Sequence, residues 1–275
     1  MSSPLVTVSD LQIDLRGDAP TVLDVRWELS TGSNRYEYER GHIPGAAFVD
    51  LDRDLSAPPG RNGRHPLPDS DRFTASMRAL GVSSHRPVVV YDAGIGMAAA
   101  RGWWCLRYFG HPAVAVLDGG LKAWVAAGGV LRSGAEPASS GDFVGRPGGM
   151  PILDADSAAA LAWRGVLLDA RAPERFRGDV EPIDPVAGHI PGARNWSAAL
   201  SLDESGVFVD PGTLRVDFAR LGIGPGTEVG AYCGSGVSAA LQVLALELTG
   251  IAAALYPGSW SEWSADPGRS VATGP

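Results

Sequence analysis

Residues 41–46 read Gly-His-Ile-Pro-Gly-Ala, and the same six residues return at positions 188–193. A second pair of matching stretches precedes them: residues 23–26 read Leu-Asp-Val-Arg and residues 168–171 read Leu-Asp-Ala-Arg. The two pairs keep the same order and nearly the same spacing along the chain. Chance matches would scatter, so the sequence predicts two copies of one domain.

The repeat also suggests where the domains begin and end. We expect an N-terminal domain over residues 1–135 and a C-terminal domain over residues 151–275. Between them, residues 136–150 are rich in glycine, proline and serine and are predicted to be the linker. A chain of 275 residues is long enough for two such domains, each with its own core.

The order of elements within a copy favours an α/β fold. Thr21–Val25, Pro87–Tyr91 and Ala113–Leu117 are short apolar runs that predict strands, and their continuous apolarity is typical of strands covered on both faces. Ala98–Phe109 predicts a helix between two of them. We therefore predict that each copy is a mostly parallel sheet flanked by helices, with ligands bound at the carboxyl ends of its strands.

Composition excludes several classes of protein. Lys and Arg number 23 against 31 Asp and Glu, a formal net charge of -8, which disfavours nucleic acid and anionic membranes as partners. The only two cysteines, Cys105 and Cys233, rule out a disulfide scaffold and a multi-cysteine metal site. Without a long apolar run or a signal-like N-terminus, we expect a cytoplasmic protein that needs no metal or cofactor.

Cys233 stands where a ligand site is expected. Glu228–Tyr232 predicts a strand, residues 233–238 a glycine-rich loop and the apolar stretch from Ala239 a helix. The N–H groups of such a turn and the positive end of a helix both favour a thiolate over a thiol. The alternative is a small buried apolar residue, which is what we expect for Cys105 on its apolar helix.

Two familiar uses of a reactive cysteine fit poorly. A cysteine phosphatase needs an arginine six positions after the cysteine to hold the phosphoryl oxygens, and Ala239 stands there. A papain-like protease needs a histidine base, which the five histidines leave formally open, but no protease signature surrounds Cys233.

The two-copy layout, the repeated Gly-His-Ile-Pro-Gly-Ala motif, the Cys-Gly-Ser-Gly-Val-Ser loop at 233–238 and the Gly-Ser-Trp-Ser-Glu-Trp ending at 258–263 resemble tandem-domain rhodanese sulfurtransferases. The resemblance covers essentially the whole chain. It implies two rhodanese-like domains, the first inactive because Asp92 replaces the cysteine. It also implies that Cys233 takes a sulfane sulfur from a donor, holds it as a persulfide, and passes it to cyanide, a thiol or a thioredoxin-like protein.

The resemblance further implies which residues bind the donor, a small anion such as thiosulfate or 3-mercaptopyruvate. Arg175, which precedes a phenylalanine, would contact the anion, whereas Arg171 would brace the fold. The remaining residues of the loop would cradle the sulfur and the donor: Gly234, Ser235, Gly236, Val237 and Ser238. By position, a Ser-His-Asp relay described for mercaptopyruvate enzymes maps onto Ser235, His65 and Asp52, which would place the site at the domain interface.

The motifs conflict over the donor. The Cys-Gly-Ser-Gly-Val-Ser loop is similar to that of mercaptopyruvate enzymes. Those enzymes usually carry a second arginine nine positions after the one at 175, however, and this chain has Asp184, as in the thiosulfate branch. A carboxylate there would repel an anionic donor unless it pointed away. The sequence leans to 3-mercaptopyruvate and leaves thiosulfate open.

Two other functions remain open from the sequence. Gly94 and Gly96 follow a predicted strand and Asp118 follows the next, close to the spacing of a dinucleotide-binding fingerprint. The second copy lacks this glycine spacing, which argues against that interpretation. The thiol could also relay sulfur between protein partners without catalysing turnover of small donors.

Overall fold

The computed structural model describes residues 3–137 and 140–275, and its chain divides into two compact units. Unit 1 consists of Met1–Ala57, Leu67–Met150 and Glu204–Val207. Unit 2 consists of Pro58–Pro66, Pro151–Asp203 and Phe208–Pro275. The segment Pro58–Pro66 therefore packs with the second copy of the repeat, although its sequence position lies within the first.

Unit 1 is built on a five-stranded sheet with the strand order β1-β7-β6-β2-β5, in which every neighbouring pair is parallel. A short antiparallel pair, β3 and β4, lies beside it. The strands are β1 Leu5–Val6, β2 Thr21–Asp24, β3 Trp27–Glu28, β4 Gly32–Ser33, β5 Ala47–Phe48, β6 Val88–Tyr91 and β7 Val114–Leu117. The helices are α1 Val8–Asp14, α2 Arg35–Arg40, α3 Leu51–Asp54, α4 Ser70–Ala79, α5 Met97–Tyr108 and α6 Gly120–Ala126.

Unit 2 repeats this plan with a four-stranded parallel sheet in the order β11-β10-β8-β9. The strands are β8 Val166–Asp169, β9 Arg194–Asn195, β10 Val229–Tyr232 and β11 Ala253–Leu255. The helices are α7 Ala155–Arg164, α8 Pro173–Arg177, α9 Pro211–Arg220, α10 Ser238–Leu248 and α11 Ser259–Trp263, with a 3-10 turn, η1, at Ala198–Ser201.

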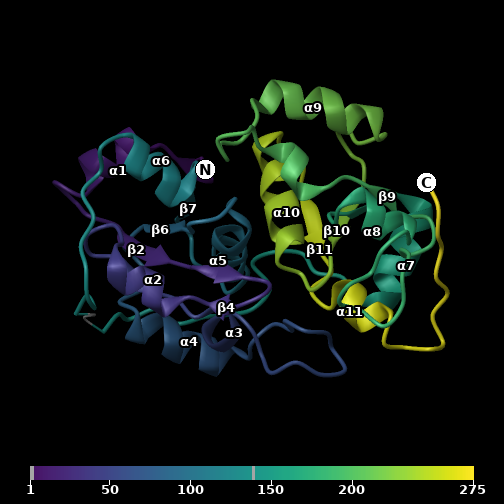
Figure 1. The fold of residues 1–275 in the computed structure, drawn as a ribbon, viewed down its shortest axis with the longest axis horizontal. Helices are drawn as coiled ribbons and strands as arrows, with labels where there is room; N and C mark the ends of the chain where they lie inside the picture. The colour runs from purple at the N-terminus through teal and green to yellow at the C-terminus, as the bar shows by residue number, and fades with distance from the viewer. Residues whose placement is uncertain (1–2, 138–139) are drawn as a thin grey trace. The chain divides into compact units, whose positions relative to one another are not determined.

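The central strands are buried along their whole length, as their apolar sequences predict. All four residues of β6, of β8 and of β10 are buried, because helices cover the sheets. Helix α5 packs on β6 and β7, and α10 packs on β10 and β11 (Figure 1). The predicted α/β fold with parallel sheets flanked by helices is confirmed. Among the described residues, no helix is both long enough and apolar enough to cross a membrane.

An aspartate and an arginine join the two repeated motifs in each unit. In unit 1, Arg26 contacts the Asp24 carboxylate at 2.9 Å and donates to the carbonyl of Gly41. In unit 2, Arg171 contacts Asp169 at 2.6 Å and donates to the carbonyl of Gly188 at 2.6 Å. Each buried ion pair therefore ties the end of a central strand to the start of a Gly-His-Ile-Pro-Gly-Ala turn, which explains why both motifs recur together.

The repeated histidines have a structural role of the same kind. His42 donates from Nδ1 to the carbonyl of Tyr38 at 2.9 Å and stacks on that tyrosine ring. His189 donates to the carbonyl of Phe176 at 2.8 Å and stacks on the Phe176 ring. Burial lowers the pKa of His189, which keeps its ring neutral at physiological pH.

The predicted linker is packed against unit 1 where the structure describes it. Residues 138–139 lie outside the described residues. Beyond them, Gly141 donates to the carbonyl of Arg78, and Arg146 donates to the carbonyl of Phe109. Phe143 is buried and lies edge-on to the Phe73 ring. The second half of the connection is thus part of the surface of unit 1 and does not behave as a free tether.

Candidate active site

Cys233 directly follows β10 and begins the loop that leads into α10. Its side chain is buried, with 2% of the residue exposed, and its Sγ accepts a hydrogen bond from the Gly236 N–H at 3.1 Å. Gly236 has a φ of 77°, a left-handed conformation that favours glycine. The loop therefore curls back so that the Gly236 N–H faces the sulfur, an arrangement that suits a thiolate or a persulfide anion.

Ser259 and Trp260 hold the backbone of Cys233 from the other side. The Cys233 N–H donates to Ser259 Oγ at 3.1 Å, and Ser259 Oγ donates in turn to the carbonyl of Tyr256 at 2.8 Å. The Trp260 N–H donates to the carbonyl of Cys233 at 2.9 Å. Both backbone groups of the cysteine are satisfied, so its position is well defined.

The role of Ser259 was not foreseen from the sequence. It has a φ of 54°, a strained conformation for a residue other than glycine, and in unit 1 the corresponding residue is Gly120, also at 54°. The strain is tolerated where the hydroxyl anchors Cys233. A serine at a position that holds glycine in the other copy was the available signal.

Arg175 lies on α8 with its guanidinium above the cysteine loop. A Cβ atom built on Gly234 would lie 3.6 Å from Arg175 Nη1, so the arginine closely approaches the backbone that follows Cys233. Its side chain is 15% exposed and pairs with Glu181 at 2.6 Å. Arg171 also pairs with Glu181, at 3.2 Å, and stays buried, in keeping with a bracing role.

Asp184 does not face the loop as an isolated negative charge. Its carboxylate is buried and pairs with Arg175 at 3.2 Å and with Arg64. The repulsion that the sequence suggested is therefore offset by two guanidinium groups. The sequence alone does not reveal the role of Arg64, because its partner Asp184 lies 120 residues away along the chain.

The structure brings His65 and Ser235 together within unit 2. His65 Nδ1 and Ser235 Oγ are joined by a hydrogen bond of 2.8 Å, and both residues are buried. Asp52 belongs to unit 1, where the Trp27 Nε1–H group contacts both of its carboxylate oxygens at 3.2 Å. Burial raises the pKa of Asp52. The third place in the relay stays a prediction.

The remaining loop residues connect Cys233 to α10. Gly234 leaves room for the two arginines, since an added Cβ would lie only 3.0 Å from Arg64 Nη2. Val237 is the N-cap residue of α10 and Ser238 is its first residue, so both join the Cys233 loop to the helix. The positive end of the helix dipole therefore lies at the end of the loop that Cys233 begins.

Unit 1 holds a carboxylate where unit 2 holds the thiol. Asp92 Oδ1 accepts the N–H groups of Gly94 and Gly96, and Oδ2 accepts those of Ala98 and Ala99, at 2.9–3.1 Å. Burial raises the pKa of Asp92, and these four donors oppose the rise. The anion-binding loop is thus present in both units, but in unit 1 it is filled by the protein itself.

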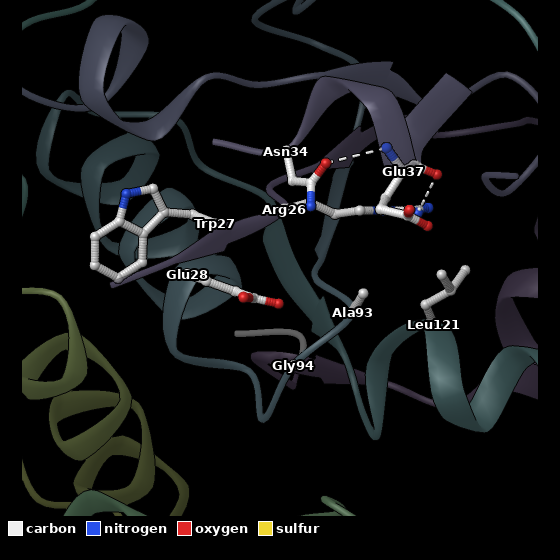
Figure 2. A pocket seen from close by; sticks show the side chains of 8 residues that line it. All are labelled: Arg26, Trp27, Glu28, Asn34, Glu37, Ala93, Gly94 and Leu121. Carbon is white, nitrogen blue, oxygen red and sulfur yellow. Dashed lines mark hydrogen bonds between the residues drawn. The ribbon is translucent and has the colours of Figure 1, made fainter. Parts of the chain in front are cut away.

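A cavity of about 260 Å³ opens beside that loop in unit 1. Figure 2 shows its lining, with Arg26 directed toward the carbonyl side of Glu37 and with Ala93 and Gly94 at the loop. No cysteine lines it. The cavity is lined by Arg26, Trp27, Glu28, Asn34, Glu37, Ala93, Gly94 and Leu121.

The same contacts argue against dinucleotide binding. The backbone N–H groups of Gly94 and Gly96 would have to receive a pyrophosphate, yet both donate to the Asp92 carboxylate. A second anion there would face the charge of Asp92 and find these donors already engaged. The fingerprint spacing at Gly94, Gly96 and Asp118 therefore does not indicate a nucleotide site.

Comparisons with known proteins agree with this geometry. The model of the family described as "Rhodanese-like domain" matches residues 7–127 and 154–266. A Pseudomonas aeruginosa protein named "Probable 3-mercaptopyruvate sulfurtransferase" is 47% identical over 281 residues, covering 99% of each chain. A Mycobacterium tuberculosis protein named "Putative thiosulfate sulfurtransferase SseB" is 46% identical over 279 residues, covering 98% of this chain and 97% of its own.

Among solved structures, Escherichia coli SseA, whose title names the rhodanese fold and 3-mercaptopyruvate sulfotransferases, superposes with a TM-score of 0.82 and 31% identity. The alignment covers 95% of this chain and 100% of that chain. With matches to both halves and relatives aligned over nearly their whole length, the chain belongs to the rhodanese-like domain family and carries two copies of its domain.

Proposed function

We propose that this protein is a sulfurtransferase that moves a sulfane sulfur from a small anionic donor to a thiophilic acceptor through a persulfide on Cys233. The proposal rests on a buried thiol that lies at the carboxyl end of a central parallel strand. The Gly236 backbone nitrogen lies 3.1 Å from its sulfur, and the Arg175 guanidinium lies close to the following residue, Gly234. An anionic donor and a nucleophilic sulfur need this combination.

The reaction runs in two half-reactions. In the first, the Cys233 thiolate attacks the outer sulfur of the donor and forms an S–S bond. The donor bond to that sulfur breaks, and sulfite leaves thiosulfate, or the enolate of pyruvate leaves 3-mercaptopyruvate, with the electron pair. In the second, cyanide, a thiol or a thioredoxin-like protein attacks the outer sulfur of the persulfide, and Cys233 leaves as a thiolate.

The test of this function is direct detection of the intermediate. Incubation with donor in the absence of acceptor is expected to add the mass of one sulfur atom to the peptide that contains Cys233. Addition of cyanide should then release thiocyanate and restore the original mass. A peptide that stays unmodified with both donors, under conditions where a known sulfurtransferase is loaded, would show that the proposal is wrong.

The contact between His65 and Ser235 supports 3-mercaptopyruvate as the preferred donor. Its leaving group is an enolate that needs a proton at carbon, whereas sulfite is stable as an anion and needs none. A hydroxyl joined to an imidazole by a hydrogen bond of 2.8 Å is a suitable general acid. We assign Ser235 as the residue that delivers the proton and His65 as the residue that positions and resupplies it.

Replacement of His65 by glutamine should separate the two donors. Loss of the general acid is expected to lower kcat/KM for 3-mercaptopyruvate about 10²-fold and to change kcat/KM for thiosulfate less than about threefold. Steady-state assays of pyruvate and sulfite release measure both. His85→Gln is the matched control, because the His85 side chain is 76% exposed and remote from the loop in sequence. Equal losses with the two donors would contradict the assignment.

A further inference from the structure

We propose that Arg64 is a second donor-binding residue and that Asp184 is the carboxylate that holds Arg64 and Arg175 in place above the cysteine loop. The inference rests on the proposed sulfur transfer and adds to it a specificity-determining residue that the repeat does not contain. Mercaptopyruvate enzymes usually carry a second arginine at the position of Asp184. In this chain Arg64, from the loop Pro58–Pro66, would supply that second positive charge.

The backbone of the loop is fixed against the segment that holds Cys233. The Arg64 N–H donates to Ser261 Oγ at 3.0 Å, and Ser261 Oγ donates to the carbonyl of Gly258 at 3.0 Å. Gly63, at a φ of 97°, lies so close that an added Cβ would come within 2.6 Å of the Gly258 carbonyl oxygen. Only glycine permits this approach, so the start of the Arg64 side chain is placed by tight backbone packing.

The guanidinium of Arg64 extends from there to the residue after the cysteine. Its Nη2 lies 3.0 Å from the Cβ position of Gly234, nearer than Arg175 Nη1 at 3.6 Å. Both arginines contact Asp184, so two planar donor groups lie side by side above the same peptide. This is the geometry that a carboxylate or sulfonate recognises with several charge-assisted hydrogen bonds.

Arg64 also retains hydrogen-bonding capacity for a ligand. Its Nε is buried and has no hydrogen-bond partner within residues 3–137 and 140–275, while the side chain as a whole is 26% exposed. A buried donor left unpaired on a charged group is costly, and an arriving anion could satisfy it. The unpaired Nε therefore points to a ligand rather than to a purely structural ion pair.

The balance of charge explains why Asp184 is tolerated in an anion site. Three arginines face three carboxylates in this network, so it carries no net charge before the donor arrives. A structural arginine at position 64 would serve only to neutralise Asp184. A donor-binding arginine would act on the anion whether or not residue 184 is charged, and the two roles can be separated by experiment. The network consists of Arg64, Arg171, Arg175, Asp169, Glu181 and Asp184.

The test is a double-mutant cycle on donor binding. Arg64→Gln is expected to raise the apparent KM for the anionic donor roughly tenfold or more, with a much smaller change in kcat, because it removes a charge-assisted contact made on binding. A rise in the same direction, smaller because the asparagine amide holds Arg64 less firmly, is expected when Arg64→Gln is introduced into the Asp184→Asn variant. Arg175→Ala provides the reference for a donor-binding arginine.

The control variant is Arg61→Gln, which removes the same charge from an exposed position of the same loop and should leave KM unchanged. Arg64→Gln without effect on KM, or with an effect that disappears in the Asp184→Asn background, would overturn the inference. Mass spectrometry of Cys233 at saturating donor distinguishes this failure from that of the proposed function. If only the inference about Arg64 is wrong, a persulfide still forms on Cys233. If the proposed function is wrong, no persulfide forms in any variant.

Discussion

Replacement of Cys233 by serine is expected to abolish persulfide formation and to lower turnover by at least about 10³-fold. A serine hydroxyl at the same place would still face the Gly236 N–H, but it is not ionised near neutral pH. Its oxygen also cannot form the S–S bond of a persulfide. Donor consumption and the mass of the loop peptide both measure the effect. Binding of the anionic donor should survive, because Arg175 and Arg64 are untouched.

Cys105→Ser is the matched control, since it makes the same atom exchange at the other cysteine. Cys105 is fully buried on α5, burial raises the pKa of its thiol, and its Sγ lies 3.8 Å from the carbonyl of Leu55, which a serine hydroxyl can also approach. Activity should be largely retained. Equal loss of activity in the two variants would contradict a mechanism that runs through Cys233 alone.

Replacement of Asp92 by asparagine is expected to destabilise the protein by about 2–4 kcal/mol. The carboxylate accepts two backbone N–H groups on each oxygen, and the amide group of asparagine can accept on one side only. Two buried N–H groups would then face an NH₂ group that also donates. Denaturant unfolding followed by tryptophan fluorescence measures the change in the free energy of unfolding.

Asp142→Asn separates this effect from the simple loss of a charge. Asp142 is exposed and accepts one backbone N–H, that of Ser84, at 2.9 Å. Its replacement should change the free energy of unfolding much less than Asp92→Asn does, because an exposed carboxylate is well solvated and screened. If Asp92→Asn were no less stable than Asp142→Asn, the four hydrogen bonds to Asp92 would not be the interaction that holds this loop.

Much of the fold can be predicted from local sequence patterns, because the same patterns occur in both copies of the repeat. The apolar runs before Tyr91 and Tyr232 predict central strands, and both tyrosine hydroxyls accept a backbone N–H from the repeated turn, that of Ile43 at 3.0 Å and that of Ile190 at 3.1 Å. Because the same contacts recur in both units, the repeat marks the residues that stabilise the scaffold. Cys233 could be recognised as the exception, since it replaces the residue that fills the loop in unit 1.

Other features of the site have no local pattern. His65 meets Ser235 across a sequence separation of 170 residues, and Arg64 meets Asp184 across 120. No periodicity or spacing rule links residues so far apart, so the role of the loop Pro58–Pro66 could be recognised only in the folded chain. From the sequence, Asp184 could only be interpreted as an unfavourable charge.

The sequence by itself determined that the chain is a duplicated α/β domain with one reactive cysteine, because strand periodicity, turn glycines and the repeat are all short-range properties of the chain. Only the tertiary structure decided that residues 58–66 pack with unit 2 and that Ser259 anchors the cysteine backbone. It also decided that two arginines share the carboxylate of Asp184. The physical reason is that the charge and hydrogen bonding of a buried side chain depend on neighbours brought together by folding, and these need not be near in sequence.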